Sequence, residues 1–288
     1  MAAVEFAGSM VAIVTPFRDG AVDVDAFGGL VEWHLASGTA AIVVSGTTGE
    51  AATLRMEERE ALCRRAVAIC KGRCPVIAGT GTNATWSTVE ATRAAVGWGV
   101  DGLLVVTPYY VKPTQAGLLA HFEEVARAAG GCPIIAYDVP GRTGVTIAEE
   151  TCHRLARIPG VVALKDATHD VERAARLARE TPLTILSGDD ALTLPLMRGG
   201  ARGVISVTAN IVPDRMARLC AEQDAALHEQ LVPLFRALFV ESNPIPLKFA
   251  LAETGRIRNE LRLPLVPLSA EHEPTVRGVL QAMDVPGC

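Results

Sequence analysis

A lysine ends one of the most apolar runs of the chain, and its position predicts a nucleophilic amine. Lys165 directly follows Val161–Leu164. A lysine held between packed walls loses hydration, which disfavours the ammonium form and lowers the pKa from about 10.4 toward roughly 7–8. A neutral amine of this kind attacks carbonyl carbons and forms an imine. The alternative is a strand-end lysine paired with Asp166 or another carboxylate, and position alone leaves both interpretations open.

A second candidate is the turn Ser45-Gly46-Thr47-Thr48-Gly49-Glu50. It offers two threonine hydroxyls and several free backbone N–H groups where a strand gives way to a helix, which is chemistry for holding a carboxylate or phosphate. The turn lacks the Gly-Lys-Ser/Thr of a Walker A loop and is not G-x-G-x-x-G. An ordinary glycine-rich turn is the alternative interpretation.

Two further side chains have functional groups that could take part in catalysis or binding. Tyr137 has the chemistry of a proton shuttle and Arg142 that of a bidentate carboxylate clamp. Taken alone, each also fits a structural role, the tyrosine as packing and the arginine in a surface ion pair. The six histidines are scattered and show no metal-ligand spacing. We therefore predict no metal and no cofactor.

Eight short apolar runs, each followed by a helical pattern, predict the elements that position these residues. Alternating strands and helices indicate a parallel α/β sheet, and eight units in one chain favour closure into a (β/α)8 TIM barrel. The predicted strands are Met10–Val14, Ala40–Val44, Pro75–Gly79, Gly102–Val106, Pro133–Tyr137, Val161–Lys165, Leu183–Ser187 and Gly203–Val207.

Glycines punctuate this pattern. Gly38, Gly99 and Gly200 each stand just before a predicted strand, where a left-handed glycine ends a helix and turns the chain. From Pro213 onward only helical patterns remain. We therefore predict a barrel over residues 1–223 and a C-terminal helical extension over 224–288, packed on the barrel as one structural domain.

The polar candidates collect at the C-terminal ends of the predicted strands, which is the face where barrel active sites lie. Lys165 ends the sixth strand and Tyr137 the fifth, while Gly188 follows the seventh and Thr47 the second. The predicted fold thus brings residues from distant parts of the chain to one face.

Composition excludes several classes of function. The formal net charge of −5 disfavours nucleic acid and anionic membranes as partners. Seven cysteines without a C-x-x-C pair indicate thiols in a reducing compartment, not a disulfide framework. Neither a signal peptide nor an apolar run long enough to span a membrane is evident. We expect a cytoplasmic protein.

Together, these motifs resemble the dihydrodipicolinate synthase family of the pyruvate-dependent class I aldolases. The matching segments run from Val11–Pro16 to Leu261–Ser269 and cover nearly the whole chain. Two motifs carry most of the resemblance, the turn Gly46–Glu50 and the lysine segment Val162–Ala167. The segment Glu241–Lys248 also resembles the tail of the synthase.

The resemblance implies an imine-forming lyase that condenses pyruvate with L-aspartate 4-semialdehyde to 4-hydroxy-tetrahydrodipicolinate, in the diaminopimelate route to lysine. It implies a homotetramer built as a dimer of dimers, in which Tyr110 reaches the active site of a neighbouring subunit. By the same likeness, the expected catalytic residues are Lys165, Tyr137, Thr47 and Tyr110, and the expected substrate-binding residues are Thr48, Arg142, Ile205 and Gly188.

Asp138 departs from the family pattern, which commonly has asparagine at this position. We expect its carboxylate to pair with Arg142 or to alter the charge of the pocket, with consequences for the second substrate.

A second departure concerns inhibition. Asn83 and Tyr109 match the pocket of lysine-inhibited members, whereas serine, histidine, histidine and glutamate are replaced here by Ala51, Met56, Arg59 and Ser87. Without the acidic residue, the amino groups of lysine lose their charge partner. Free lysine is therefore expected to inhibit weakly or not at all, and strong inhibition at sub-millimolar lysine in a rate assay would contradict this prediction.

Three alternatives stay open. Another pyruvate-dependent aldolase, acting on N-acetylneuraminate or a 2-keto-3-deoxy sugar acid, would share the lysine and the tyrosine, but usually lacks an arginine such as Arg142. A non-catalytic barrel that binds keto acids should have lost Lys165 or Tyr137. A metal-dependent barrel hydrolase needs clustered histidine and carboxylate ligands, which the sequence does not show.

Overall fold

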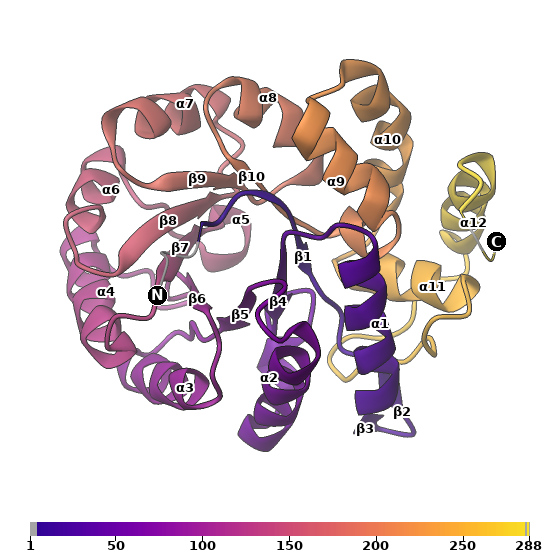
Figure 1. The fold of residues 1–288 in the computed structure, drawn as a ribbon, viewed down its shortest axis with the longest axis horizontal. Helices are drawn as coiled ribbons and strands as arrows, with labels where there is room; N and C mark the ends of the chain where they lie inside the picture. The colour runs from indigo at the N-terminus through magenta and orange to yellow at the C-terminus, as the bar shows by residue number, and fades with distance from the viewer. Residues whose placement is uncertain (1–4, 286, 288) are drawn as a thin grey trace.

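Eight parallel strands form a closed barrel at the centre of the molecule (Figure 1). The computed structural model describes residues 5–285 and residue 287. Around the ring the strands follow the order β1-β10-β9-β8-β7-β6-β5-β4, so that β1 closes the barrel between β4 and β10. The predicted TIM barrel is confirmed. The strands are β1 (Gly8–Ala12), β4 (Ala41–Val44), β5 (Val76–Gly79), β6 (Gly102–Val106), β7 (Ile134–Asp138), β8 (Val161–Asp166), β9 (Thr184–Ser187) and β10 (Gly203–Ser206).

A short antiparallel hairpin, β2 (Phe17–Arg18) and β3 (Ala21–Val22), follows the first barrel strand. The sequence pattern did not predict it, because strands of two residues carry no periodicity.

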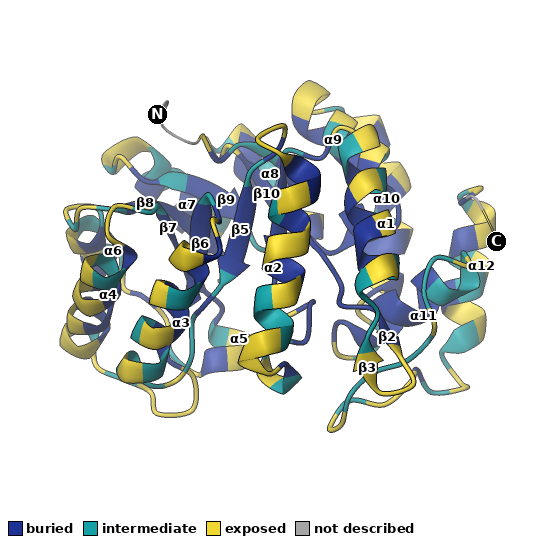
Figure 2. Ribbon diagram, turned by 60° about the horizontal axis from the view of Figure 1, so that its bottom comes forward, coloured by how far each residue is buried: buried dark blue, intermediate teal, exposed yellow. Residues whose placement is uncertain are grey.

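Helices surround the barrel, with buried residues toward the strands and exposed residues toward solvent (Figure 2). This is the amphipathic pattern from which they were predicted. The α-helices up to the end of the barrel are α1 (Val24–Ala36), α2 (Met56–Cys70), α3 (Thr85–Gly97), α4 (Gln115–Ala129), α5 (Pro140–Thr143), α6 (Glu149–Leu155), α7 (Val171–Glu180), α8 (Thr193–Arg198) and α9 (Pro213–Glu222). Short 3-10 turns are η1 (Ala51–Thr53), η2 (Asp190–Leu192) and η3 (Thr208–Asn210).

Strand alternation divides the buried residues into two clusters. One cluster fills the barrel, and Ile135, Tyr137 and Ala163 belong to it. The other lies between the strands and the helices and contains Ala136 and Leu164. Successive side chains of a strand point to opposite faces. Position 165 therefore faces the interior with Tyr137, while positions 138 and 166 face the helices.

The three glycines expected to end helices adopt the predicted backbone. The φ angles are 80° at Gly38, 85° at Gly99 and 110° at Gly200. An L side chain would be strained in this left-handed region, which glycine adopts freely.

Three helices follow the barrel: α10 (Ala225–Ala237), α11 (Ile245–Glu253) and α12 (Glu273–Ala282). Helices α11 and α12 lie on the right of Figure 1, beyond α1. Buried residues of α11, including Leu247 and Leu251, belong to the same apolar cluster as the outer faces of the strands. The predicted division at residues 223 and 224 falls between α9 and α10 and remains a prediction.

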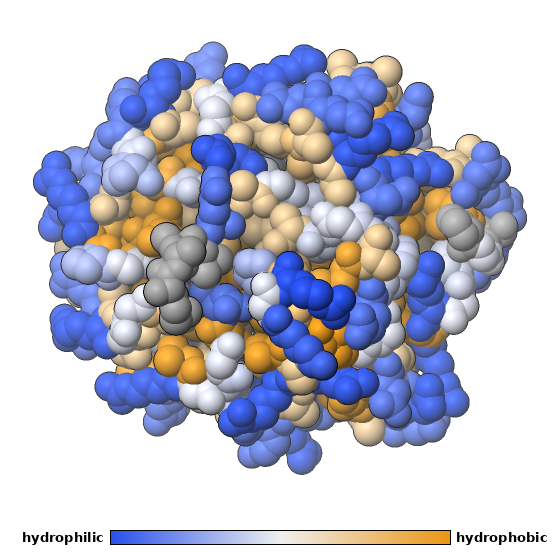
Figure 3. Space-filling view, viewed as in Figure 1, coloured by the Kyte–Doolittle hydropathy of each residue, from blue (hydrophilic) through white to orange (hydrophobic). Residues whose placement is uncertain are grey.

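Within residues 5–285, every helix is too short or too polar to cross a membrane. Hydrophilic side chains cover much of the periphery of the face seen in Figure 3. The six cysteines that the structure describes are free thiols, and all but Cys132 are buried.

Candidate active site

Lys165 and Tyr137 lie side by side at the ends of two neighbouring strands. They are register partners of β8 and β7, and Lys165 Nζ lies 4.2 Å from the centroid of the tyrosine ring. Each residue is only 6% exposed. Among the described residues, no hydrogen bond or ion pair to Lys165 Nζ is found. The alternative pairing with Asp166 is wrong, because that carboxylate faces the other way and pairs with Arg173.

Burial lowers the pKa of Lys165 to about 8. The negative charge of Asp190 partly opposes this shift, and the guanidinium of Arg142 adds to it. Asp190 Oδ2 is itself occupied by the backbone N–H groups of Val207 and Thr208, at 3.1 and 2.8 Å. A substantial fraction of Lys165 is therefore neutral near physiological pH, which is the form that attacks a carbonyl group.

The pKa of Tyr137 shifts in the opposite direction from that of Lys165, because burial raises the pKa of its phenol to about 12. The positive charge of Arg142 partly opposes that shift. The phenol consequently keeps its proton at neutral pH. A protonated hydroxyl beside a neutral amine forms a donor and nucleophile pair suited to carbonyl chemistry.

A cavity of about 330 Å³ opens beside Tyr137. Of the predicted site residues, Thr47, Tyr137 and Arg142 line it. The rest of the wall includes residues at the ends of β5 and β6, residues 50–53, and two C-terminal segments, Ser242–Pro244 and Pro264–Leu265. This volume fits small organic molecules, and its mixture of apolar groups, hydroxyls and two guanidinium groups, those of Arg59 and Arg142, is typical of ligand sites.

The structure places Lys165, Thr48, Ile205 and Gly188 outside the lining of this cavity, with Lys165 directly beside the lining residue Tyr137. Thr48 is buried, and its hydroxyl accepts a 3.0 Å hydrogen bond from Asn243 Nδ2. Ile205 is 1% exposed and belongs to the interior cluster with Tyr137. At Gly188 an added Cβ would lie 2.8 Å from the Cβ of Ala167, so this position is closed to larger side chains.

Tyr110 stands apart from the other predicted residues. It follows β6, has a left-handed φ of 70° and is 86% exposed. It is not among the residues that line the cavity of its own chain.

The turn at Gly46–Glu50 is anchored by residues that the motif did not identify. Glu50 has a left-handed φ of 54°, and its buried carboxylate accepts from Lys248 Nζ at 2.6 Å and from the backbone N–H of Arg262 at 3.1 Å. Lys248 also donates to the backbone oxygen of Thr15 at 2.9 Å. Both side chains of the pair are 0% exposed. A lysine inside the apolar helix α11 was the available signal in the sequence.

Asn243 was also missed as an individual residue. Its Nδ2 fixes Thr48, and its backbone oxygen accepts from Arg142 Nη2 at 3.3 Å. One residue of the C-terminal segment thus contacts both the turn after β4 and the arginine of α5.

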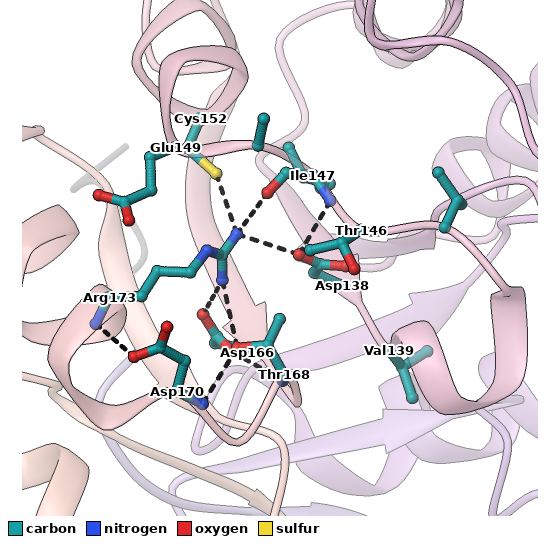
Figure 4. Close-up of polar contacts among 12 residues, drawn as sticks. Asp138, Val139, Thr146, Ile147, Glu149, Cys152, Asp166, Thr168, Asp170 and Arg173 are labelled. Atoms are coloured by element: carbon teal, nitrogen blue, oxygen red, sulfur yellow. Dashed lines mark hydrogen bonds and ion pairs between the residues drawn. The ribbon is translucent and has the colours of Figure 1, made fainter.

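The expected pairing of Asp138 with Arg142 is wrong. Its side chain lies on the outer face of β7 and pairs with Arg173 at 3.0 Å, not with Arg142 (Figure 4). Burial raises the pKa of Asp138 to about 7, although the positive charge of Arg173 opposes the shift. Asp138 therefore does not add a carboxylate to the wall of the cavity.

The positions compared with lysine-inhibited proteins lie partly in the same cavity. Ala51, Arg59 and Tyr109 line it. The one carboxylate among the described lining residues is Glu50, which is engaged with Lys248. In the described part of the chain, no group of three or more histidine, cysteine or acidic side chains has the arrangement of a metal site.

Comparison with known proteins gives a single family. The Dihydrodipicolinate synthetase family matches residues 5–283. The 4-hydroxy-tetrahydrodipicolinate synthase of Cellvibrio japonicus is 49% identical over 284 residues, covering 95% of this chain and 98% of the relative. The protein of the same name from Pseudomonas aeruginosa is 48% identical, with 96% and 98% covered.

Solved structures give the same result. The chloride-inhibited dihydrodipicolinate synthase of Acinetobacter baumannii, complexed with pyruvate, has a TM-score of 0.95 and 45% identity, covering 98% of this chain and 100% of that one. The dihydrodipicolinate synthase of Aquifex aeolicus has a TM-score of 0.94 and 45% identity, with 98% and 99% covered.

Proposed function

Because the chain belongs to the Dihydrodipicolinate synthetase family, we propose that it condenses pyruvate with L-aspartate 4-semialdehyde to 4-hydroxy-tetrahydrodipicolinate. The observation that carries the proposal is the buried amine of Lys165, which has a lowered pKa and no hydrogen-bond or ion-pair partner among the described residues, beside the protonated phenol of Tyr137. The full-length similarity to synthases supports the same reaction.

The first half of the reaction activates pyruvate. The lone pair of Lys165 Nζ attacks the ketone carbon, and the carbonyl oxygen leaves as water after proton transfers in which Tyr137 serves as donor and acceptor. The resulting protonated imine withdraws electrons, so a methyl proton leaves and an enamine forms.

The second half makes the new carbon–carbon bond. The enamine carbon attacks the aldehyde carbon of the semialdehyde, and the aldehyde oxygen takes up a proton to become the hydroxyl group. The amine of the second substrate then replaces Lys165 at the imine carbon, which closes the ring and releases the enzyme.

Substrate binding is assigned to groups around the amine. Arg142 lines the cavity and has the planar fork that holds a carboxylate, here that of the semialdehyde. The hydroxyl and N–H of Thr48 and the backbone of Ile205 are assigned to the pyruvate carboxylate, with Gly188 nearby at the end of β9. Thr47 also lines the cavity, and we assign it to the proton relay with Tyr137.

The relay needs a second subunit. Tyr110 is exposed beside its own cavity, so we assign its hydroxyl to the site of a neighbouring chain in a homotetramer built from tight dimers. We place this assembly in the cytoplasm, the compartment expected from the sequence.

The decisive experiment traps the imine. Incubation with pyruvate and borohydride should leave one reduced adduct, and peptide mass mapping should find it on Lys165. The chain has only four lysines, at positions 71, 112, 165 and 248, so the assignment is direct. A coupled assay with the semialdehyde, run against sugar acids, separates synthase from sugar-acid aldolase. An unmodified Lys165, or turnover of sugar acids alone, would overturn the proposal.

The rate of imine formation should rise with pH up to about 8 and then level off. Because the Lys165 pKa is lowered to about 8, the neutral amine grows about tenfold per pH unit below that value and levels off above it. Initial rates of trapping with pyruvate between pH 6 and 9.5 measure this directly. A trapping rate that keeps rising past pH 10, as it would for an ordinary lysine, would contradict a pKa lowered by burial of the Lys165 amine.

A further inference from the structure

One buried guanidinium contacts both strands that carry the proposed catalytic pair. Arg173, on α7, is 5% exposed. Its Nη2 donates to Asp138 Oδ2 at 3.0 Å, and its Nη1 donates to Asp166 Oδ2 (Figure 4). The two carboxylates end β7 and β8 and are register partners.

The residues before those carboxylates are Tyr137 and Lys165, which are also register partners. Because successive side chains alternate between faces, the same two strand tips present the proposed catalytic groups to the interior and the two carboxylates to the helices. A force on the outer pair therefore acts on the spacing of the inner pair.

Without a cation, this outer pair would be two buried carboxyl groups that repel each other whenever both are charged, and burial already raises the pKa of Asp138 to about 7. Like charges at opposite positions on paired strands destabilise the pairing, and these carboxylates are buried, with Asp138 0% and Asp166 3% exposed. Arg173 converts this repulsion into a bridge, because one planar guanidinium donates to both strands.

The bridge is fixed in turn by the surrounding backbone. Arg173 Nη2 also donates to the backbone oxygen of Ile147 at 2.6 Å, and the N–H of Ile147 donates to Asp138 Oδ2 at 3.1 Å. The second carboxylate of the bridge is held as well, because the hydroxyl of Thr168 donates to Asp166 Oδ1 at 2.6 Å. The guanidinium therefore has little freedom to follow a displaced strand tip.

We propose that Arg173 is a positioning residue of the reaction, which sets the separation of Tyr137 and Lys165 by bridging Asp138 and Asp166 behind them. This inference rests on the proposed function for the identity of the reacting groups. It adds a residue that touches neither substrate nor cavity.

The first test replaces Arg173 by lysine, which keeps the charge but cannot bridge two carboxylates with one planar fork. The rate of borohydride trapping with pyruvate should fall about 10- to 100-fold, since a misplacement of about 1 Å costs up to this much. The pH limb of trapping should move above 8, because a displaced tip exposes the amine. The control is Arg176→Met on the same helix, where the lost partner is Glu149 at 2.7 Å, away from the strand tips.

A matched pair at Asp138 tests the bridge without removing the cation. Asp138→Asn still accepts from Arg173 and Ile147 and should keep the trapping rate within about threefold. Asp138→Leu has similar volume but no acceptor, so its rate should fall together with that of R173K. This pair decides the question even if R173K does not fold.

Thermal unfolding of each variant fixes an assay temperature at which all of them are folded. If folded R173K and D138L trap pyruvate at the wild-type rate with an unchanged pH limb, Arg173 only stabilises the fold and the inference is overturned. If D138N slows as much as D138L, the charge and not the bridge is responsible, which also overturns it. Failure of the wild-type protein to trap pyruvate would instead refute the proposed function.

Discussion

Replacing Lys165 by arginine is expected to abolish imine formation and to lower turnover by about 10³-fold or more. The guanidinium keeps the positive charge and much of the length of the side chain, but it stays protonated and cannot form the imine. Mass spectrometry after borohydride treatment should show no pyruvate adduct, and the coupled assay should show only background turnover.

The matched control for this variant is Lys71→Arg, at an exposed position just after α2. It should trap pyruvate and turn over like the wild-type protein. If K165R still gave a borohydride-stable adduct with pyruvate, another amine would be the nucleophile, and the proposed mechanism would be wrong.

Replacing Lys248 by methionine is expected to cost about 3–5 kcal/mol of unfolding free energy, because it leaves the carboxylate of Glu50 buried without a counter-charge. Both members of the pair are fully buried, so water cannot compensate for the loss. Denaturant unfolding, monitored by circular dichroism, measures the change. The double variant E50Q/K248M should recover part of it, since the uncompensated charge is removed.

A surface ion pair provides the comparison. Arg64→Met removes the i,i+4 partner of Glu60 on α2, where both side chains are well exposed. The expected cost is below about 0.5 kcal/mol. Equal losses for K248M and R64M would show that the Glu50 pair is not a critical support of the turn.

The barrel and its lysine were predictable because both depend on local patterns. The β-branched run before Lys165 gives a strand, and strand alternation places its amine with Tyr137 inside the barrel. The left-handed glycines were equally local, since Gly38 and Gly99 end helices by their own conformational freedom.

Contacts between distant segments were not predictable in the same way. Glu50 and Lys248 are 198 positions apart, and nothing in the turn motif indicates that Lys248 is the cation that pairs with Glu50. Asp138 is a second example of a contact that local patterns do not give. Alternation with Tyr137 already indicates that its side chain points outward, but its partner Arg173 lies 35 positions later in the sequence, on helix α7. The role proposed for the exposed Tyr110 depends on a second chain, which a single sequence does not place.

Closure of the barrel also has a consequence for biosynthesis. Strand β1 is made before every other strand of the barrel, but one of its two neighbours, β10, is the last barrel strand to be made. Until residues 203–206 emerge, one edge of β1 offers unpaired N–H and C=O groups to any other extended chain. This edge of β1 therefore stays open to pairing with other chains while the six barrel strands from β4 to β9 are made, and the pairing of β10 closes it.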